Sequence, residues 1–112
     1  MSIKLSEKQL EKQCMDLLRA ERWLVFQTHG HQAFKSAGDV GQCDLVAVKW
    51  FPHMHLRTLF LELKTLKGRR SNEQCAWAER AYRLGFIVHV IRSIEELKAI
   101  LRSSAASSSA RL

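Results

Sequence analysis

Three charged residues, Asp44, Glu62 and Lys64, lie inside otherwise apolar stretches of the chain. In a strand, the side chains of Glu62 and Lys64 point to one face because they are two residues apart, while Leu61 and Leu63 point to the other. A carboxylate and an ammonium group in mid-strand are costly to bury unless they pair or bind something. A solvated hairpin face would hold the same three residues, so residue types and spacing alone leave both interpretations open.

A pair of predicted strands could bring two of these charges together. Residues 43–51 and 57–65 are rich in the apolar and β-branched residues typical of strands. The connection of about five residues is too short for a parallel crossover, so an antiparallel hairpin is predicted. Asp44 can then approach Glu62, and two carboxylates so placed repel each other. A divalent cation relieves that repulsion, and carboxylates with water suit Mg²⁺.

The remaining segments predict the elements that position this hairpin. Helices are expected at about 6–21, 71–84 and 93–102, with further strands at 23–28 and 86–91. Ser6 with Gln9, and Ser71 with Gln74, match the capping box that begins a helix. The second helix is expected to bury an apolar stripe of Cys75, Ala78, Ala81, Tyr82 and Leu84. The predicted fold class is α/β: a small mixed β-sheet, made of an antiparallel hairpin and a parallel βαβ unit, flanked by helices.

Composition limits the class of protein. The chain has 112 residues, which is one domain's worth; we assign that domain to 1–102 and expect a disordered Ser/Ala-rich tail at 103–112. Eighteen Lys and Arg against 11 Asp and Glu favour a polyanionic partner, nucleic acid more than a membrane surface. The three cysteines form no CxxC pair and no apolar run is long enough for a membrane span, so a cytoplasmic protein is expected.

Three motifs together resemble the VRR-NUC domain of the PD-(D/E)XK nuclease superfamily. They are GQCDL at 41–45, ELK at 62–64 and GRRSNEQ at 68–74, followed by Trp77. The resemblance extends over about residues 6–97 and implies a restriction-endonuclease-like core. The ELK spacing alone is unspecific, whereas its combination with the other two motifs is specific. One position departs from the family, because Cys43 stands where a proline is usual.

The resemblance implies a role for each residue of the site. Asp44 and Glu62 would bind the metal, with the backbone carbonyl of Leu63 as a third oxygen. Lys64 would orient or help to activate the attacking water. Gln74 would form a hydrogen bond beside the site that holds the lysine or the phosphate.

The first helix would add an outer carboxylate for a second metal ion or a metal-bound water. Glu7 fits the family position better, but Glu11 lies four residues later on the same helix face. Both residues remain candidates. Either one could also be a solvated carboxylate of the first helix turns.

The resemblance also implies an activity. We expect a Mg²⁺-dependent endodeoxyribonuclease, with Mn²⁺ as a substitute, that cleaves branched DNA such as Holliday junctions and acts as a homodimer in a bacterial or phage-infected cell. DNA contacts are expected from Lys67, Arg69, Arg70 and Lys35. Two alternatives stay open: a basic DNA-binding module without catalysis, and a nuclease directed at RNA.

Overall fold

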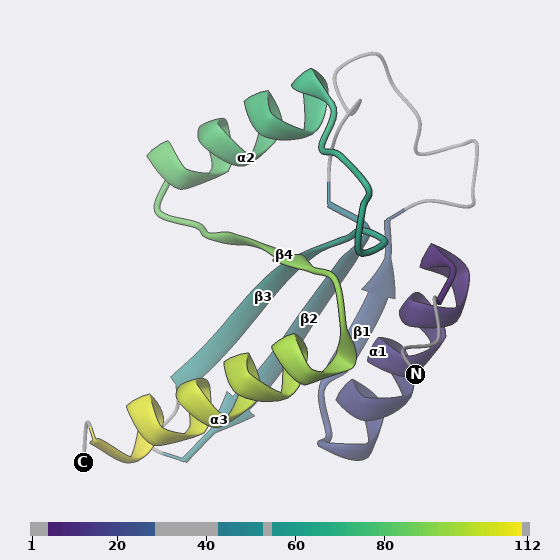
Figure 1. Ribbon diagram of the computed structural model, residues 1–112. Helices are drawn as coiled ribbons and strands as arrows, with labels where there is room; N and C mark the ends of the chain where they lie inside the picture. The colour runs from purple at the N-terminus through teal and green to yellow at the C-terminus, as the bar shows by residue number, and fades with distance from the viewer. Residues whose placement is uncertain (1–4, 29–42, 53–54, 111–112) are drawn as a thin grey trace.

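The computed structural model describes residues 5–28, 43–52 and 55–110, with side chains up to residue 103. The elements follow in the order α1 (Glu7–Ala20), β1 (Leu24–Gln27), β2 (Leu45–Phe51), β3 (His55–Leu63), α2 (Asn72–Arg83), β4 (Val88–Ile91) and α3 (Ile94–Ala110). The predicted order of elements is confirmed (Figure 1).

The four strands form one mixed sheet in the order β1-β2-β3-β4. The first three strands pair antiparallel, and Leu45 of β2 lies opposite Leu61 of β3. β3 and β4 pair parallel, with Glu62 opposite Val90. Both predicted units, the hairpin and the parallel crossover through α2, are therefore present.

The core lies on the face of the sheet that α1 and α3 cover. Alternate residues of the strands point into it, as the period of two requires. It consists of Leu10, Cys14, Leu18, Trp23, Leu45, Ala47, Leu59, Leu61, Leu63, Ile91 and Leu97. The Ser6–Gln9 capping box of α1 is complete, and at the start of α3 the Glu96 amide donates to the Ser93 hydroxyl at 3.4 Å. This core holds the carboxyl end of β3 rigidly in place.

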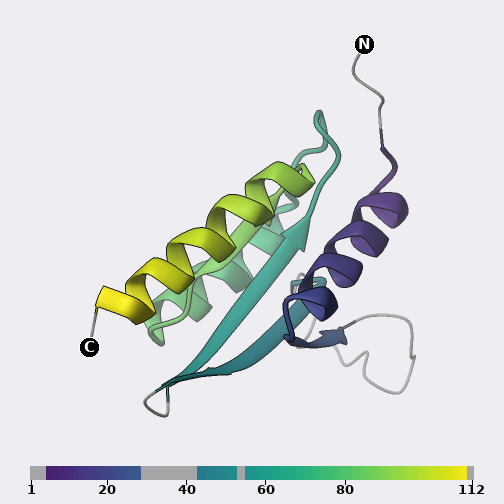
Figure 2. The ribbon, with the colours of Figure 1, turned by 90° about the horizontal axis from the view of Figure 1, so that it is seen from below.

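α2 packs on the opposite face, and its buried side differs from the prediction. α2 and α3 lie on opposite sides of β4, and in the view from below α3 lies in front of α2 (Figures 1 and 2). The Trp77 and Phe60 ring centroids are 6.3 Å apart, and Ala81 is the buried residue of this helix. Tyr82 and Leu84 are 71% and 76% exposed and Cys75 is exposed as well, so the predicted stripe was wrong for these three residues. The side of α2 that packs on the sheet therefore includes Trp77, whose ring contacts Phe60 of β3.

The last helix also departs from the prediction. α3 continues to Ala110, about eight residues beyond the expected end of the last helix near Arg102. The disordered tail at 103–112 stays a prediction. The added residues are Ser and Ala without Gly or Pro, and a helix once begun gains one hydrogen bond for each residue added. Within the described residues, no helix combines the length and the apolar content needed to cross a membrane.

Candidate active site

Asp44 occupies the position just before β2, where its carboxylate replaces a backbone acceptor. The Asp44 amide donates to the Leu61 carbonyl at 2.8 Å, which continues the β2–β3 pairing by one residue. The Asp44 Oδ2 atom then accepts a hydrogen bond from the Leu63 amide at 2.7 Å. The paired register of β2 and β3 ends with Leu45 opposite Leu61; Asp44 precedes the first of these residues and Glu62 follows the second. The approach of the Asp44 and Glu62 carboxylates to each other stays a prediction.

Glu62 is the one charged residue that is fully buried in the described part of the chain, at 1% exposure. Both of its carboxylate oxygens accept from Arg70: Nε donates to Oε2 at 2.9 Å and Nη2 to Oε1 at 3.1 Å. A buried carboxylate needs such a partner, since it would otherwise be left unsolvated. The hydrogen bonds to Glu62 raise the pKa of Arg70, which keeps the guanidinium charged. Arg70, predicted to contact DNA, is therefore engaged at the site itself.

Lys64 follows β3 directly, at the start of the turn that leads to α2. Its amide donates to the Ile91 carbonyl at 3.0 Å, so its backbone continues the pairing with β4. A Cβ on Gly68 would lie 3.5 Å from the Lys64 Cδ and 2.9 Å from the Thr65 Oγ1. Glycine at 68 thus lets the turn fold closely onto the lysine stem. The Lys64 side chain is partly exposed.

Sequence reasoning missed Arg92, which fixes the same turn from β4. Its Nη1 atom donates to the carbonyls of Thr65 at 2.8 Å and Gly68 at 2.7 Å. Charge-assisted bonds of this kind are stronger than neutral ones. The signal available was an arginine directly after a buried strand that is parallel to β3. Arg92 therefore positions the segment between Lys64 and Arg70.

A shallow hollow of about 280 Å³ joins α1 to the ends of β2 and β3. Its lining consists of Glu7, Lys8, Glu11, Asp44 and Leu63. Both candidate carboxylates of α1 thus lie beside Asp44. Glu11 accepts a hydrogen bond from the Gln27 side chain at 2.9 Å, whereas the structure gives the Glu7 carboxylate no partner among the described residues.

Gln74 forms its hydrogen bonds with Ser71 and not with the groups predicted from the sequence. Its Oε1 atom accepts from the Ser71 amide at 2.9 Å, and its own amide donates to the Ser71 Oγ at 3.0 Å. The side chain completes the capping box of α2. The predicted hydrogen bond toward the lysine or phosphate is not among the contacts of Gln74.

The structure describes three of the four residues that are predicted to contact DNA. Lys67 and Arg69 are exposed in the turn between β3 and α2. Arg70 is 30% exposed at its side chain and pairs with Glu62. Lys35 lies outside the described residues. We call residues 67–70 the basic turn. It presents Lys67 and Arg69 to solvent, whereas Arg70 is bound to Glu62.

The donor types fit a hard divalent cation, although they are not gathered around one point. Among the described residues, no three Asp, Glu, His or Cys side chains are grouped closely enough to hold a metal ion. Three acidic residues nevertheless line the hollow between α1 and the ends of β2 and β3, namely Glu7, Glu11 and Asp44. Carboxylate and carbonyl oxygens are the ligands that Mg²⁺ and Mn²⁺ prefer. Glu62 is not among the residues that line the hollow, and Arg70 binds both of its carboxylate oxygens.

Cys43 precedes Asp44 in the chain, and its thiol is buried. Burial, and secondarily the nearby Asp44 charge, raise the pKa of its thiol to about 12. A neutral buried thiol is neither a nucleophile nor a metal ligand near pH 7. The residue that stands in the usual proline position is therefore a packing residue.

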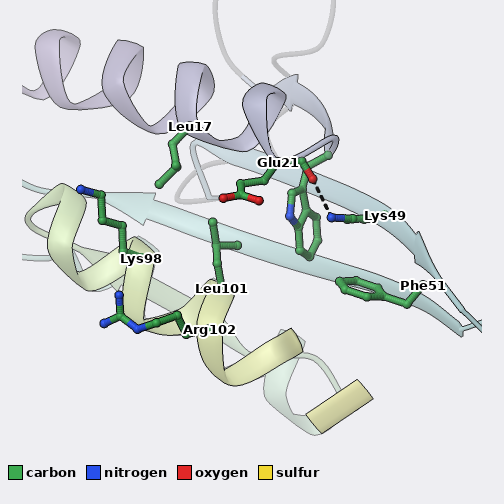
Figure 3. A pocket seen from close by; sticks show the side chains of 8 residues that line it. Leu17, Glu21, Lys49, Phe51, Lys98, Leu101 and Arg102 are labelled. Carbon is green, nitrogen blue, oxygen red and sulfur yellow. Dashed lines mark hydrogen bonds between the residues drawn. The ribbon is translucent and has the colours of Figure 1, made fainter. Parts of the chain in front are cut away.

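A second hollow of about 360 Å³ lies between α1 and α3 (Figure 3). Its lining consists of Leu17, Glu21, Trp23, Lys49, Phe51, Lys98, Leu101 and Arg102. The Lys49 Nζ atom donates to the Glu21 carbonyl at 2.6 Å and lies 5.1 Å from the Phe51 ring centroid. The two hollows share no lining residue, and this one contains none of the motif residues.

The chain was also compared with known proteins. No family model, no curated protein and no solved structure matches it. The assignment of a function therefore depends on the motifs and on the geometry described above.

Proposed function

We propose that this chain is a metal-dependent endonuclease that hydrolyses the phosphodiester bonds of DNA on a restriction-endonuclease-like core. The observation that supports this most strongly is the convergence of acidic residues from separate elements. Glu7 of α1, Asp44 before β2 and Leu63 of β3 line one hollow, and Glu62 is the residue before Leu63 in β3. These are the positions at which the family resemblance expects metal ligands.

The proposed reaction adds water across a phosphodiester bond. Water attacks phosphorus, the bond to the 3′ oxygen breaks, and that oxygen leaves with a proton, which yields a 5′-phosphate and a 3′-hydroxyl. A bound Mg²⁺ or Mn²⁺ would neutralise charge on the phosphoryl oxygens and lower the pKa of water. Asp44, Glu62 and the Leu63 carbonyl would hold that ion, and Glu7 would act from the outer side. Lys64 would orient the water and stabilise the developing negative charge.

The basic turn supports DNA as the substrate. Lys67 and Arg69 are exposed within five residues of Lys64, on a chain of formal net charge +7. Cations placed beside a cleavage site attract the phosphate backbone regardless of sequence, with an affinity that falls as salt rises. Backbone contacts of this kind suit recognition of a DNA shape such as a branch.

An open apolar sheet face supports a homodimer. Leu24, Phe26, Trp50 and Leu56 point away from the core, and each is 49% to 62% exposed. Side chains of this size bring on the order of 400 Å² of apolar surface to each copy, and two copies approach the ~1,000 Å² of a specific interface. A second copy of the chain would cover this face and supply a second site, as cutting both strands of a junction requires.

One observation favours a second candidate, a basic DNA-binding module without catalysis. Glu62 is held by both of its oxygens, so the buried pair with Arg70 is a complete structural ion pair as it stands. Such a chain would keep its basic turn and bind DNA without a metal ion.

A cleavage panel separates these candidates. It contains a Holliday junction, a flap, a splayed arm, a linear duplex and a single strand, with RNA versions of each, in Mg²⁺, Mn²⁺ or EDTA. We expect metal-dependent cutting of branched DNA by the wild type. Lys64→Ala should lose cutting by 10²-fold or more and keep DNA binding, since removal of one electrostatic stabiliser costs about that much. The control Lys12→Ala alters an exposed lysine of α1 and should cut normally.

Each other outcome assigns a different function. Binding of DNA without cutting under any metal condition would identify the non-catalytic module. Cutting of the RNA substrates alone would identify the RNA-directed nuclease. Normal cutting by Lys64→Ala would show that the assigned site is wrong.

A further inference from the structure

The pair formed by Glu62 and Arg70 gives the proposed site a second state. We propose that Arg70 is an internal counter-cation that occupies Glu62 until a divalent metal ion displaces it, and that the released guanidinium then binds DNA phosphate. This inference rests on the proposed function and names a form of regulation within the same site.

The geometry shows why the metal ion and Arg70 compete. Arg70 uses both oxygens of the carboxylate, at 2.9 and 3.1 Å, and the carboxylate is 1% exposed. A divalent ion on those oxygens would lie within a few ångströms of the guanidinium. Two cations at that separation repel strongly away from bulk water. Only one of them can therefore be bound to Glu62 at a time.

Arg70 is also placed to leave without disturbing the fold. Its side chain is 30% exposed, so Arg70 reaches the protein surface. The backbone on both sides is anchored separately: Arg92 binds the Gly68 carbonyl, and the Ser71 cap begins α2. A change of side-chain rotamer can thus move the guanidinium outward while the turn and α2 stay in place.

The released group would join the basic turn. Lys67 and Arg69 are exposed there, and a free guanidinium binds phosphate through two parallel hydrogen bonds. Metal binding would then raise DNA affinity, and DNA would raise metal affinity by the same factor, because such coupling is reciprocal. All three cations of the basic turn would be free to bind phosphate only when the metal ion is bound.

The test measures Mn²⁺ affinity by titration calorimetry in Arg70→Gln and Arg70→Lys. Arg70→Gln removes the competing cation, so we expect Mn²⁺ to bind at least tenfold more tightly than to the wild type. Arg70→Lys keeps a positive charge opposite the buried Glu62, so the variant should fold more stably than Arg70→Gln. Because an ammonium group lacks the forked geometry of the guanidinium, we expect an intermediate gain in Mn²⁺ affinity. The matched control Arg69→Gln removes an exposed neighbouring charge and should change Mn²⁺ affinity by less than threefold.

A second readout uses the wild type alone. The Arg70 Nε–H signal in a ¹⁵N NMR spectrum should shift when Mg²⁺ is added, together with the Leu63 amide bound to Asp44. If the Leu63 amide shifts and the Arg70 signal does not, or if both Arg70 variants behave like Arg69→Gln, the displacement model is overturned while the nuclease stands. If the wild type binds no Mn²⁺ and cuts no DNA, the proposed function fails and this inference fails with it.

Discussion

At the scale of single residues, the spacing of the charges predicted their faces but not their partners. Period-two alternation correctly separated Glu62 from Leu61 and Leu63, because strand geometry alone decides which way a side chain points. The partner of Glu62 depends on a turn eight residues along the chain, which no local pattern describes. Arg70 was accordingly assigned to DNA, although in the structure it binds the carboxylate.

The hydrogen bond from Leu63 to Asp44 predicts a difference between two substitutions. Asp44→Ala removes the acceptor of a partly buried amide, so the free energy of unfolding should fall by about 1–3 kcal/mol. Asp44→Asn keeps an acceptor oxygen and should lose less than half of that. Urea denaturation measures both. Equal losses would mean that the side chain does not support the strand end, while cutting should be lost in both variants.

The buried thiols predict weaker folding at alkaline pH. Burial raises the pKa of Cys14 and Cys43 to about 12, whereas exposed thiols ionise near 9. Between those values the unfolded chain binds fewer protons than the folded one, so stability falls as pH rises, by about 1.4 kcal/mol per pH unit for each thiol. Urea unfolding of wild type and Cys43→Ala at pH 8 and pH 10.5 checks this. The variant should lose less stability over that interval, and an identical loss would contradict the assignment.

At the scale of elements, signals confined to one turn of chain were the most reliable. Both capping boxes predicted from Ser6 and Ser71 are complete, because a cap involves only four consecutive residues. The orientation of α2 was wrong for Tyr82 and Leu84, since the helix turns to bring Trp77 against Phe60 on β3. That choice depends on a tertiary contact between aromatic rings, which a helical stripe does not encode.

Arg92 should matter more than an ordinary surface arginine. Its guanidinium holds the carbonyls of Thr65 and Gly68, so Arg92→Ala should lower the free energy of unfolding by about 2–3 kcal/mol and reduce cutting. Arg83→Ala is the matched control, because its exposed pair with Glu79 contributes about 0.5 kcal/mol or less. Thermal denaturation compares the two variants. Similar losses in both would mean that Arg92 does not organise the turn.

At the scale of the whole molecule, the order of elements followed from the sequence because short connections leave few topologies. The hairpin followed from connection length, and the parallel crossover through α2 was expected if β3 and β4 share the sheet, as they do. The exposed part of the sheet face was not foreseen, since strand patterns do not reveal how much of that face α2 leaves uncovered. A dimer was expected only from the family resemblance, and the open face now gives that expectation a specific surface.

The proposed interface makes its own prediction. Trp50→Glu places a charge within the apolar face of each copy, so a dimeric wild type should become monomeric. Tyr82→Glu alters an equally exposed aromatic residue on α2 and should remain dimeric. Sedimentation velocity measures both. A Trp50→Glu variant that stays dimeric would assign the interface to another surface.

The central claim, that acidic residues on neighbouring strands hold the ion that cleaves DNA, is tested most directly by anomalous diffraction from crystals soaked in Mn²⁺. The account predicts one peak about 2.0–2.2 Å from oxygens of both Asp44 and Glu62, with Arg70 turned away from the carboxylate. Asp44→Asn crystals treated in the same way should lose most of the peak. A fully soaked wild-type crystal with no peak at these oxygens, and Arg70 still bound to Glu62, would contradict it.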